Sequence, residues 1–155
     1  MFDLILNLLG RNIDSPEYRR LLQEVGPPSA MFDVPINEEK TLRMFEFKEF
    51  GFGASYSLQG NLFCMIGFEY HSTSKIRSMS PFLEPGPAGI VHQDGKRAVQ
   101  KKMALLPISS RKLKSYMRVT YKNGPHLIEC QFDGKGHELW GFSIALIDPS
   151  MPLSA

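Results

Sequence analysis

The sequence predicts an α+β fold in which a helix–strand–hairpin unit occurs twice, forming one curved, mainly antiparallel sheet with helices on one face. Two observations carry this prediction. Each half contains a helical segment that stops at a proline, Pro27 or Pro107, and is followed by alternating aromatic strands. Both halves also contain a turn glycine that leads into a strand with a Gly-Phe pair: GNLFCMIGFEY at 60–70 and GHELWGFSIAL at 136–146.

The clearest helix signal lies in the segment DSPEYRRLLQEVGPP, residues 14–28. Ser15 or Asp14 can cap this helix, and Pro16 suits its first turn. Gly26 can adopt a left-handed cap, and the two prolines after it prevent continuation. Four apolar residues at helical spacing form one stripe that must pack on another element: Tyr18, Leu21, Leu22 and Val25.

The rest of the first half has the pattern of β-strands. Residues 40–52 place Phe45 and Phe47 on one side of a strand and Glu46 and Lys48 on the other. A turn at Gly60-Asn61 then joins two strands as a hairpin. The second arm of the hairpin, LFCMIGFEY, is apolar on both faces, which is typical of a central strand.

The second half repeats this order. Residues 94–107 predict a basic helix, residues 112–124 an alternating strand with a basic face, and residues 126–146 a closing hairpin. The chain is therefore expected to form a single domain, residues 1–155. Its internal repeats span approximately 1–70 and 91–148, and a connection rich in Ser, Pro and Gly, residues 71–90, joins them.

Composition and charge limit the function. The chain has 155 residues, of which 43% are hydrophobic, enough for a packed core, and its net charge of +2 is too small to indicate a nucleic-acid binder. Residues 1–50 carry nine acidic and six basic side chains, a net charge of −3. Residues 91–155 carry five acidic and ten basic ones, a net charge of +5. This asymmetry indicates either two functional faces or two ordinary solvated surfaces.

The location is predicted from the N-terminus and the cysteines. The segment MFDLILNLLGR contains Asp3 and lacks a basic leader, so it is a poor signal peptide, and its apolar run is too short to span a bilayer. Cys64 and Cys130 lie apart in apolar strands, which is typical of buried thiols in a reducing compartment, although a disulfide between them stays open. These features predict a cytoplasmic protein.

The segment LLGRNIDSPEYRRLLQEVGPP resembles the opening of immunity proteins, which are small bacterial proteins found beside secreted polymorphic toxins. The order helix, Gly-Pro, strand, hairpin is also similar to the repeat of β-lactamase inhibitor protein and of small outer-membrane assembly lipoproteins. The chain lacks the lipidated cysteine and signal peptide of the lipoproteins. The resemblance implies a binding protein that uses the concave face of its sheet.

Catalytic and metal motifs are weak in this sequence. The segment His92-Gln93-Asp94 can orient an imidazole, but there is no Gly-x-Ser-x-Gly elbow, and no pair of histidines has metal-binding spacing on a helix. We therefore expect no catalytic residues, no metal, no cofactor and no enzymatic activity. The four histidines are expected to be dispensable: His71, His92, His126 and His137.

The sequence thus predicts an immunity protein that binds a cognate bacterial toxin domain and neutralises it by occlusion, with no nucleic-acid or membrane partner. Toxins of this kind are often basic, so the resemblance implies that carboxylates contact the partner. The candidates are Glu38, Glu39, Glu46 and Glu49. A basic strand that binds an acidic partner is the alternative surface, with Lys112, Lys114 and Arg118. Alternative functions are a domain that binds a small apolar ligand between sheet and helices, or a small hydrolase using His92 or His71.

Overall fold

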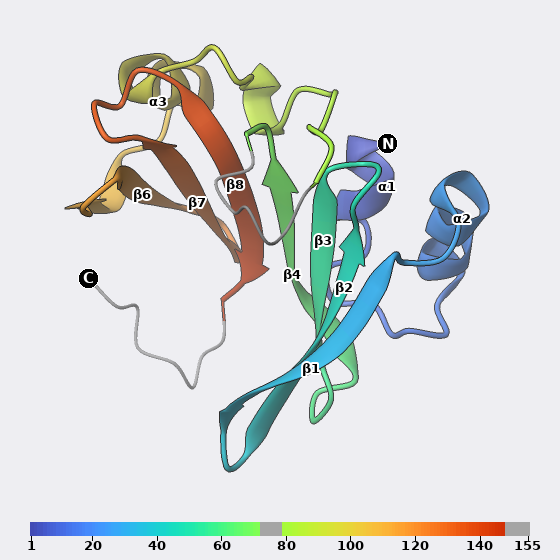
Figure 1. The fold of residues 1–155 in the computed structure, drawn as a ribbon. Helices are drawn as coiled ribbons and strands as arrows, with labels where there is room; N and C mark the ends of the chain where they lie inside the picture. The colour runs from blue at the N-terminus through green and yellow to red at the C-terminus, as the bar shows by residue number, and fades with distance from the viewer. Residues whose placement is uncertain (72–78, 148–155) are drawn as a thin grey trace.

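A computed structural model describes residues 1–71 and 79–147 of the chain. Eight strands form one antiparallel sheet. The first half contributes β1 (Ala30–Asn37), β2 (Lys40–Phe47), β3 (Phe52–Ser57) and β4 (Leu62–Glu69). The second half contributes β5 (Pro107–Lys112), β6 (Tyr116–Asn123), β7 (His126–Asp133) and β8 (Leu139–Leu146). The spatial order β1-β2-β3-β4-β8-β7-β6-β5 places two four-stranded meanders side by side in a twisted sheet (Figure 1).

The helices are short. They are α1 (Phe2–Leu6), α2 (Pro16–Val25), α3 (Lys96–Met103) and the 3₁₀ turn η1 (Pro87–Gly89). The predicted capping of α2 is present, because the Tyr18 amide donates to Ser15 Oγ at 3.3 Å and Gly26 ends the helix. Figure 1 shows α1 and α2 beside the first meander and α3 beside the second.

The predicted α+β fold class is wrong, because strands dominate the structure and the helices are small. Each half contains four strands rather than three. The additional strands, β1 and β5, are the two edges of the sheet, and each contains a proline, Pro35 or Pro107, and a shift in pairing register. Proline on an edge strand weakens the sequence signal for a strand without preventing pairing on one side. The basic helix of the second half, α3, also ends at Met103, four residues before Pro107, where the sequence predicts its end.

The hydrophobic core lies on the side of the sheet that the helices cover. Alternate residues of the inner strands point there, among them Phe45, Phe63 and Phe142, and all of them are buried. The helices and the segment after α1 complete the core with buried side chains: Ile5, Leu8, Tyr18, Leu21, Val99 and Met103.

The two meanders meet at the β4–β8 pair. Phe68 lies directly opposite Phe142, and their rings stack with centroids 4.7 Å apart at an interplanar angle of 17°. Phe82, from the connection between the halves, packs 4.7 Å from Phe68. The seam between the halves is therefore part of the continuous core.

Candidate partner-binding face

The two faces of the sheet differ in chemistry. One face carries the aromatic core under α1, α2 and α3. We call the opposite face the helix-free face. Its side chains alternate with those of the core along the strands, and near the centre of the sheet most of them are small, polar or sulfur-containing. On β3, for example, Ala54 and Tyr56 belong to the core while Gly53 and Ser55 belong to the helix-free face.

A hollow of about 210 Å³ lies on the helix-free face, over β2, β3, β4, β7 and β8. Its floor consists of small residues that are neighbours across the strands, since Gly67 pairs with Gly53 on one side and with Ser143 on the other. Larger side chains stand around this floor: Met44, Glu46, Met65, Glu69, His71, Met79, Glu129, Gln131 and Trp140.

The three glycines of the floor are required by the fold to different degrees. A Cβ atom at Gly141 would lie 2.5 Å from the carbonyl oxygen of Phe68, and one at Gly53 would lie 3.0 Å from that of Phe45. A Cβ atom at Gly67 would meet no atom of the described residues within 4 Å, and the φ angle of Gly67 is not positive. Packing therefore explains Gly141 and partly Gly53, but it does not explain Gly67. A glycine inside a strand weakens the strand and often marks a place where another chain or a ligand approaches the backbone closely.

The polar groups around the hollow are held in place. Glu46 is 6% exposed, and its carboxylate lies 3.8 Å from Lys48 Nζ. The Ser55 hydroxyl donates to Met44 Sδ at 3.3 Å. Such groups have little freedom to lose when a partner binds, which favours recognition over nonspecific contact.

Aromatic and imidazole rings form one end of the hollow. The single tryptophan, Trp140, lies at a register shift opposite β7, and its indole Nε1 donates to Glu138 Oε1 at 3.1 Å. The His71 ring lies 5.4 Å from that of Trp140 and 6.3 Å from that of His92. His92 Nδ1 lies 2.7 Å from the Leu139 carbonyl oxygen, so Nδ1 is the donor of this hydrogen bond.

The sequence pattern misplaced Trp140. Strict alternation predicts that Trp140 and Phe142 share a face, but the extra residue at the register shift places Leu139 in the core and Trp140 at the hollow. A β-bulge of this kind changes the side on which later residues point. The sequence analysis identified no signal for this bulge.

The four predicted carboxylates do not form one cluster. Glu38 and Glu39 occupy the turn between β1 and β2, while Glu49 occupies the turn at the other end of β2. A strand of this length separates its ends by roughly 25 Å, at about 3.3 Å per residue. Glu46 alone among the four lines the hollow.

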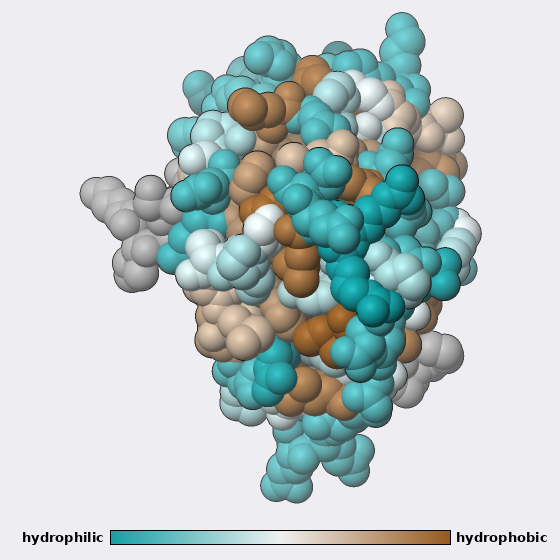
Figure 2. All heavy atoms as spheres, turned by 90° about the vertical axis from the view of Figure 1, so that its right-hand side faces the viewer, coloured by the Kyte–Doolittle hydropathy of each residue, from teal (hydrophilic) through white to brown (hydrophobic). Residues whose placement is uncertain are grey.

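On the side of the molecule where α2 and β1 lie, hydrophobic side chains are interspersed with hydrophilic ones (Figure 2).

The thiols and histidines do not assemble a recognisable catalytic or metal centre within residues 1–71 and 79–147. No group of three or more His, Cys, Asp or Glu side chains in these ranges is arranged to hold a metal ion. Cys130 is fully buried, and burial raises the pKa of its thiol to about 12, so it is a poor nucleophile at neutral pH. The Cys64 thiol donates to the Ser55 carbonyl oxygen at 3.5 Å.

Comparison with known proteins gives similarity in structure alone. No protein-family model and no curated protein sequence matches the chain. A solved structure of an extracellular protein containing a SCP domain, from Bacillus anthracis str. Ames, matches 91% of this chain with a TM-score of 0.52 and 14% identity. A cysteine-rich secretory protein from Staphylococcus aureus subsp. aureus Mu50 matches 90% of it with a TM-score of 0.53 and 9% identity. The chain spans about half of each, 45% of their lengths, so the similarity concerns the fold.

The comparison corrects the predicted cytoplasmic location, since both similar structures are described as extracellular or secretory proteins. The prediction depended partly on the two cysteines, which lie far apart in the sequence. Because Cys130 is fully buried, it is shielded from oxidants in any compartment, and an unpaired thiol of this kind does not report on the compartment. Among the described residues, no helix is long and apolar enough to cross a bilayer.

Proposed function

We propose that this chain is a binding protein that neutralises a protein partner by covering part of its surface, in the manner of an immunity protein acting on a bacterial toxin domain. The hollow on the helix-free face carries this proposal. Its floor contains Gly67, a glycine in a central strand that neither backbone conformation nor packing among the described residues requires. The position keeps the floor low, as the close approach of a partner demands.

The chemistry around the hollow suits a protein interface. Such interfaces combine aromatic and methionine side chains at their centre with polar groups at their rim. Here Trp140, Met44 and Met65 provide the apolar contacts, and the Arg118–Glu129 ion pair, with Nε and Oε1 3.0 Å apart, lies at the edge. A protein side chain is the occupant that fits a hollow of about 210 Å³ on an otherwise continuous sheet.

The interior offers less support for the alternative, a small apolar ligand between sheet and helices. Aromatic rings fill the space under α2, where Tyr18 lies 5.1 Å from Phe63 and 6.0 Å from Phe45 between ring centroids. A ligand there would have to displace packed side chains.

The two similar structures support a place of action outside the cytoplasm, because both are described as extracellular or secretory proteins. Direct occlusion requires no chemistry from the binding protein, and a rigid sheet with a few anchoring side chains is sufficient.

The test compares a filled hollow with a matched control. Gly67→Phe places a ring in the hollow without a clash at Cβ, whereas Gly134→Phe places the same ring on the β7–β8 turn. A Cβ atom at Gly134 meets its nearest atom at an ordinary 3.6 Å, and its φ angle is not positive. Each protein is immobilised, and bound proteins from cells and medium of the source organism are identified by mass spectrometry. Binding of the purified partner is then measured by calorimetry.

We expect the wild-type chain and Gly134→Phe to retain the same partner and Gly67→Phe to lose it, with both variants folded by circular dichroism. Equal affinity for all three proteins would place the interface elsewhere and refute the proposal. Retention of a partner by Gly67→Phe alone would refute it as well.

A further inference from the structure

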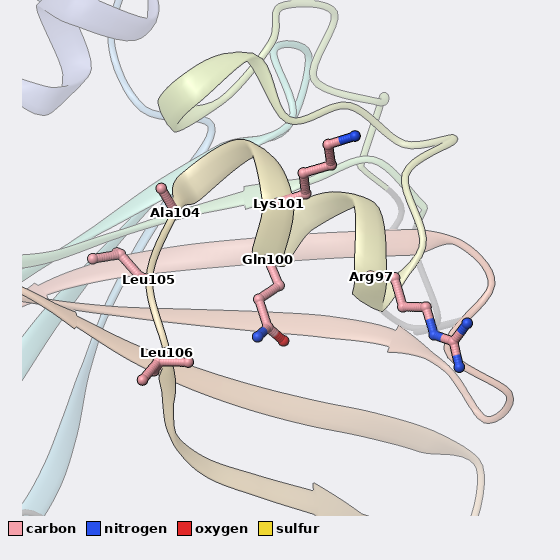
Figure 3. A pocket seen from close by; sticks show the side chains of 6 residues that line it. All are labelled: Arg97, Gln100, Lys101, Ala104, Leu105 and Leu106. Carbon is pink, nitrogen blue, oxygen red and sulfur yellow. The ribbon is translucent and has the colours of Figure 1, made fainter.

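A second surface lies at the β5 edge of the sheet, where α3 meets β5. The outer side of α3 and the segment that follows it enclose a shallow depression of about 460 Å³. Its lining combines charged and apolar groups: Arg97, Gln100, Lys101, Ala104, Leu105 and Leu106. Figure 3 shows Arg97 and Lys101 extending away from α3, while Leu105 and Leu106 follow on the segment toward β5.

Local backbone geometry creates this depression. Ala104 ends α3 in the left-handed conformation, with φ 54° and ψ 37°, and its amide donates to the Gln100 carbonyl oxygen. The chain therefore turns back beside the helix instead of continuing it. As a result, Leu106 is 81% exposed and Ile108, two residues later, is 44% exposed. Exposed leucine and isoleucine beside one another indicate a contact surface more strongly than either residue alone.

The charge at this end of the sheet is strongly positive and largely uncompensated. Asp94 and Glu129 already pair with Lys102 and Arg118. Five other exposed cations make no ion pair with any residue in the described ranges: Arg97, Lys101, Arg111, Lys112 and Lys114. We call these five cations, together with Leu106, the basic edge. Helix and strand lie against each other here, because Lys96 Nζ donates to Ser110 Oγ at 3.3 Å.

The edge strand itself has capacity for a further strand. β5 pairs with β6 on one side and is the last strand of the sheet on the other. Pairing is regular from Ser109 to Lys112, after a register shift next to Pro107. The outer backbone groups of such a segment can hydrogen-bond an extended peptide, and alternate side chains of that peptide then lie beside α3.

We propose that the basic edge docks an extended acidic segment of a partner protein, in which carboxylates alternate with apolar side chains. The carboxylates contact Arg97, Lys101 and Lys112, and an apolar side chain enters the depression beside Leu106. Nucleic acid fits this surface less well, because Tyr116 on the neighbouring strand β6 is half-buried and its hydroxyl accepts from Arg118 Nη2 at 3.1 Å. A membrane surface also fits less well, because the apolar stripe of α3, Val99 and Met103, is buried in the core.

The experiment uses fluorescein-labelled synthetic heptapeptides and fluorescence anisotropy with the full chain. The first peptide alternates glutamate and leucine, the second alternates glutamate and serine, and the third alternates lysine and leucine. The variant Arg97→Glu/Lys101→Glu reverses two charges of the basic edge. The control Lys122→Glu/Lys135→Glu makes the same change in net charge at two exposed positions of the same half, near the end of β6 and in the β7–β8 turn. Circular dichroism confirms that each variant is folded.

We expect the glutamate–leucine peptide to bind and the lysine–leucine peptide not to bind. The Arg97/Lys101 reversal weakens binding at least tenfold, about 1.4 kcal/mol, and the control reversal changes it less than threefold, about 0.65 kcal/mol. Leu106→Ser weakens binding of the glutamate–leucine peptide and leaves that of the glutamate–serine peptide unchanged. Amide hydrogen exchange of Ser109–Lys112 slows in the complex.

Three results would overturn the proposal. One is that no acidic peptide binds. Another is that both double reversals weaken binding equally, which shows a general charge effect. The third is that an oligothymidylate or phosphatidylglycerol vesicles bind more tightly than the peptide, which assigns the surface to nucleic acid or membrane.

Discussion

Two glycines of the same sheet face provide a direct test of the structure. Gly67 on β4 and Gly141 on β8 both line the hollow, but their surroundings differ. An alanine Cβ at position 141 would lie 2.5 Å from the Phe68 carbonyl oxygen, which belongs to the backbone and cannot rotate away. Overpacking of this kind costs about 1–3 kcal/mol. An alanine at position 67 meets nothing within 4 Å among the described residues and reduces the freedom of the unfolded chain, a gain of about 0.4–1 kcal/mol.

Gly67→Ala and Gly141→Ala are therefore expected to shift stability in opposite directions. For a domain of this size, 1 kcal/mol corresponds to about 2–4 °C, so a difference of about 1.4–4 kcal/mol separates their melting temperatures by roughly 3–16 °C. Thermal and urea unfolding followed by circular dichroism measure this difference. If Gly67→Ala destabilised the chain as much as Gly141→Ala, the fold would require both glycines, and the functional argument for Gly67 would fail.

Three further predictions follow from single side chains. Ala104→Gly relieves the left-handed cap of α3 and raises the free energy of unfolding by about 1 kcal/mol, whereas Ala98→Gly inside the same helix lowers it by about 0.5–1 kcal/mol, both measured by urea unfolding. Glu46→Gln weakens binding of the partner at least tenfold, about 1.4 kcal/mol, while Glu39→Gln at the β1–β2 turn has a smaller effect; calorimetry that shows equal losses contradicts this. The thiol of Cys130 has a pKa raised by burial to about 12, so the folded chain keeps a proton that the unfolded chain releases, and stability falls as pH rises from about 9 toward 12; Cys130→Ala is expected to flatten this dependence in urea unfolding at several pH values.

Local sequence signals predicted the elements whose determinants are local. The cap at Ser15 and the apolar stripe through Leu21 are sufficient to specify α2, and the structure contains both. The alternation of Phe45 and Phe47 with Glu46 and Lys48 likewise placed the aromatic rings in the core. These signals depend on residues within one or two turns or strand repeats of each other.

The sequence analysis missed the edge strands, β1 and β5. An edge strand pairs on one side only, so it tolerates proline and exposed polar residues that weaken the sequence signal for a strand. In β1, Phe32, Asp33 and Val34 alternate as in a strand, but Pro35 weakens the strand signal. In β5 the run of exposed Ser, Arg and Lys has no apolar periodicity. Without the two edge strands, the helices account for a larger share of the expected elements than of the structure. The predicted fold class was wrong for this reason.

The hollow depends on information that the linear pattern does not contain. Its position follows from strand order, in which β4 and β8 pair residues more than seventy positions apart, and from the register shift beside Trp140 in the β7–β8 hairpin. Among the carboxylates predicted from the sequence, Glu46 lies at the hollow. Its face of the sheet follows from the alternation of side chains along one strand, which the sequence shows directly. The turns that hold Glu39 and Glu49 are separated by the full length of β2, so proximity in sequence did not produce a cluster.

The repeated Gly-Phe pair links the architecture to the proposed site. In the sheet, Phe68 and Phe142 lie opposite each other and stack at the seam, so both copies of the phenylalanine have the same structural task. The glycines beside them do not. Gly141 is held by contact with the Phe68 carbonyl oxygen, whereas the Cβ position of Gly67 is open on the same face among the described residues. The two Gly-Phe dipeptides occupy equivalent places in the seam, but packing requires only one of the two glycines. The two halves therefore differ at the hollow. A requirement outside the fold itself, the approach of a partner to the β4 backbone, accounts for the glycine that packing leaves unexplained.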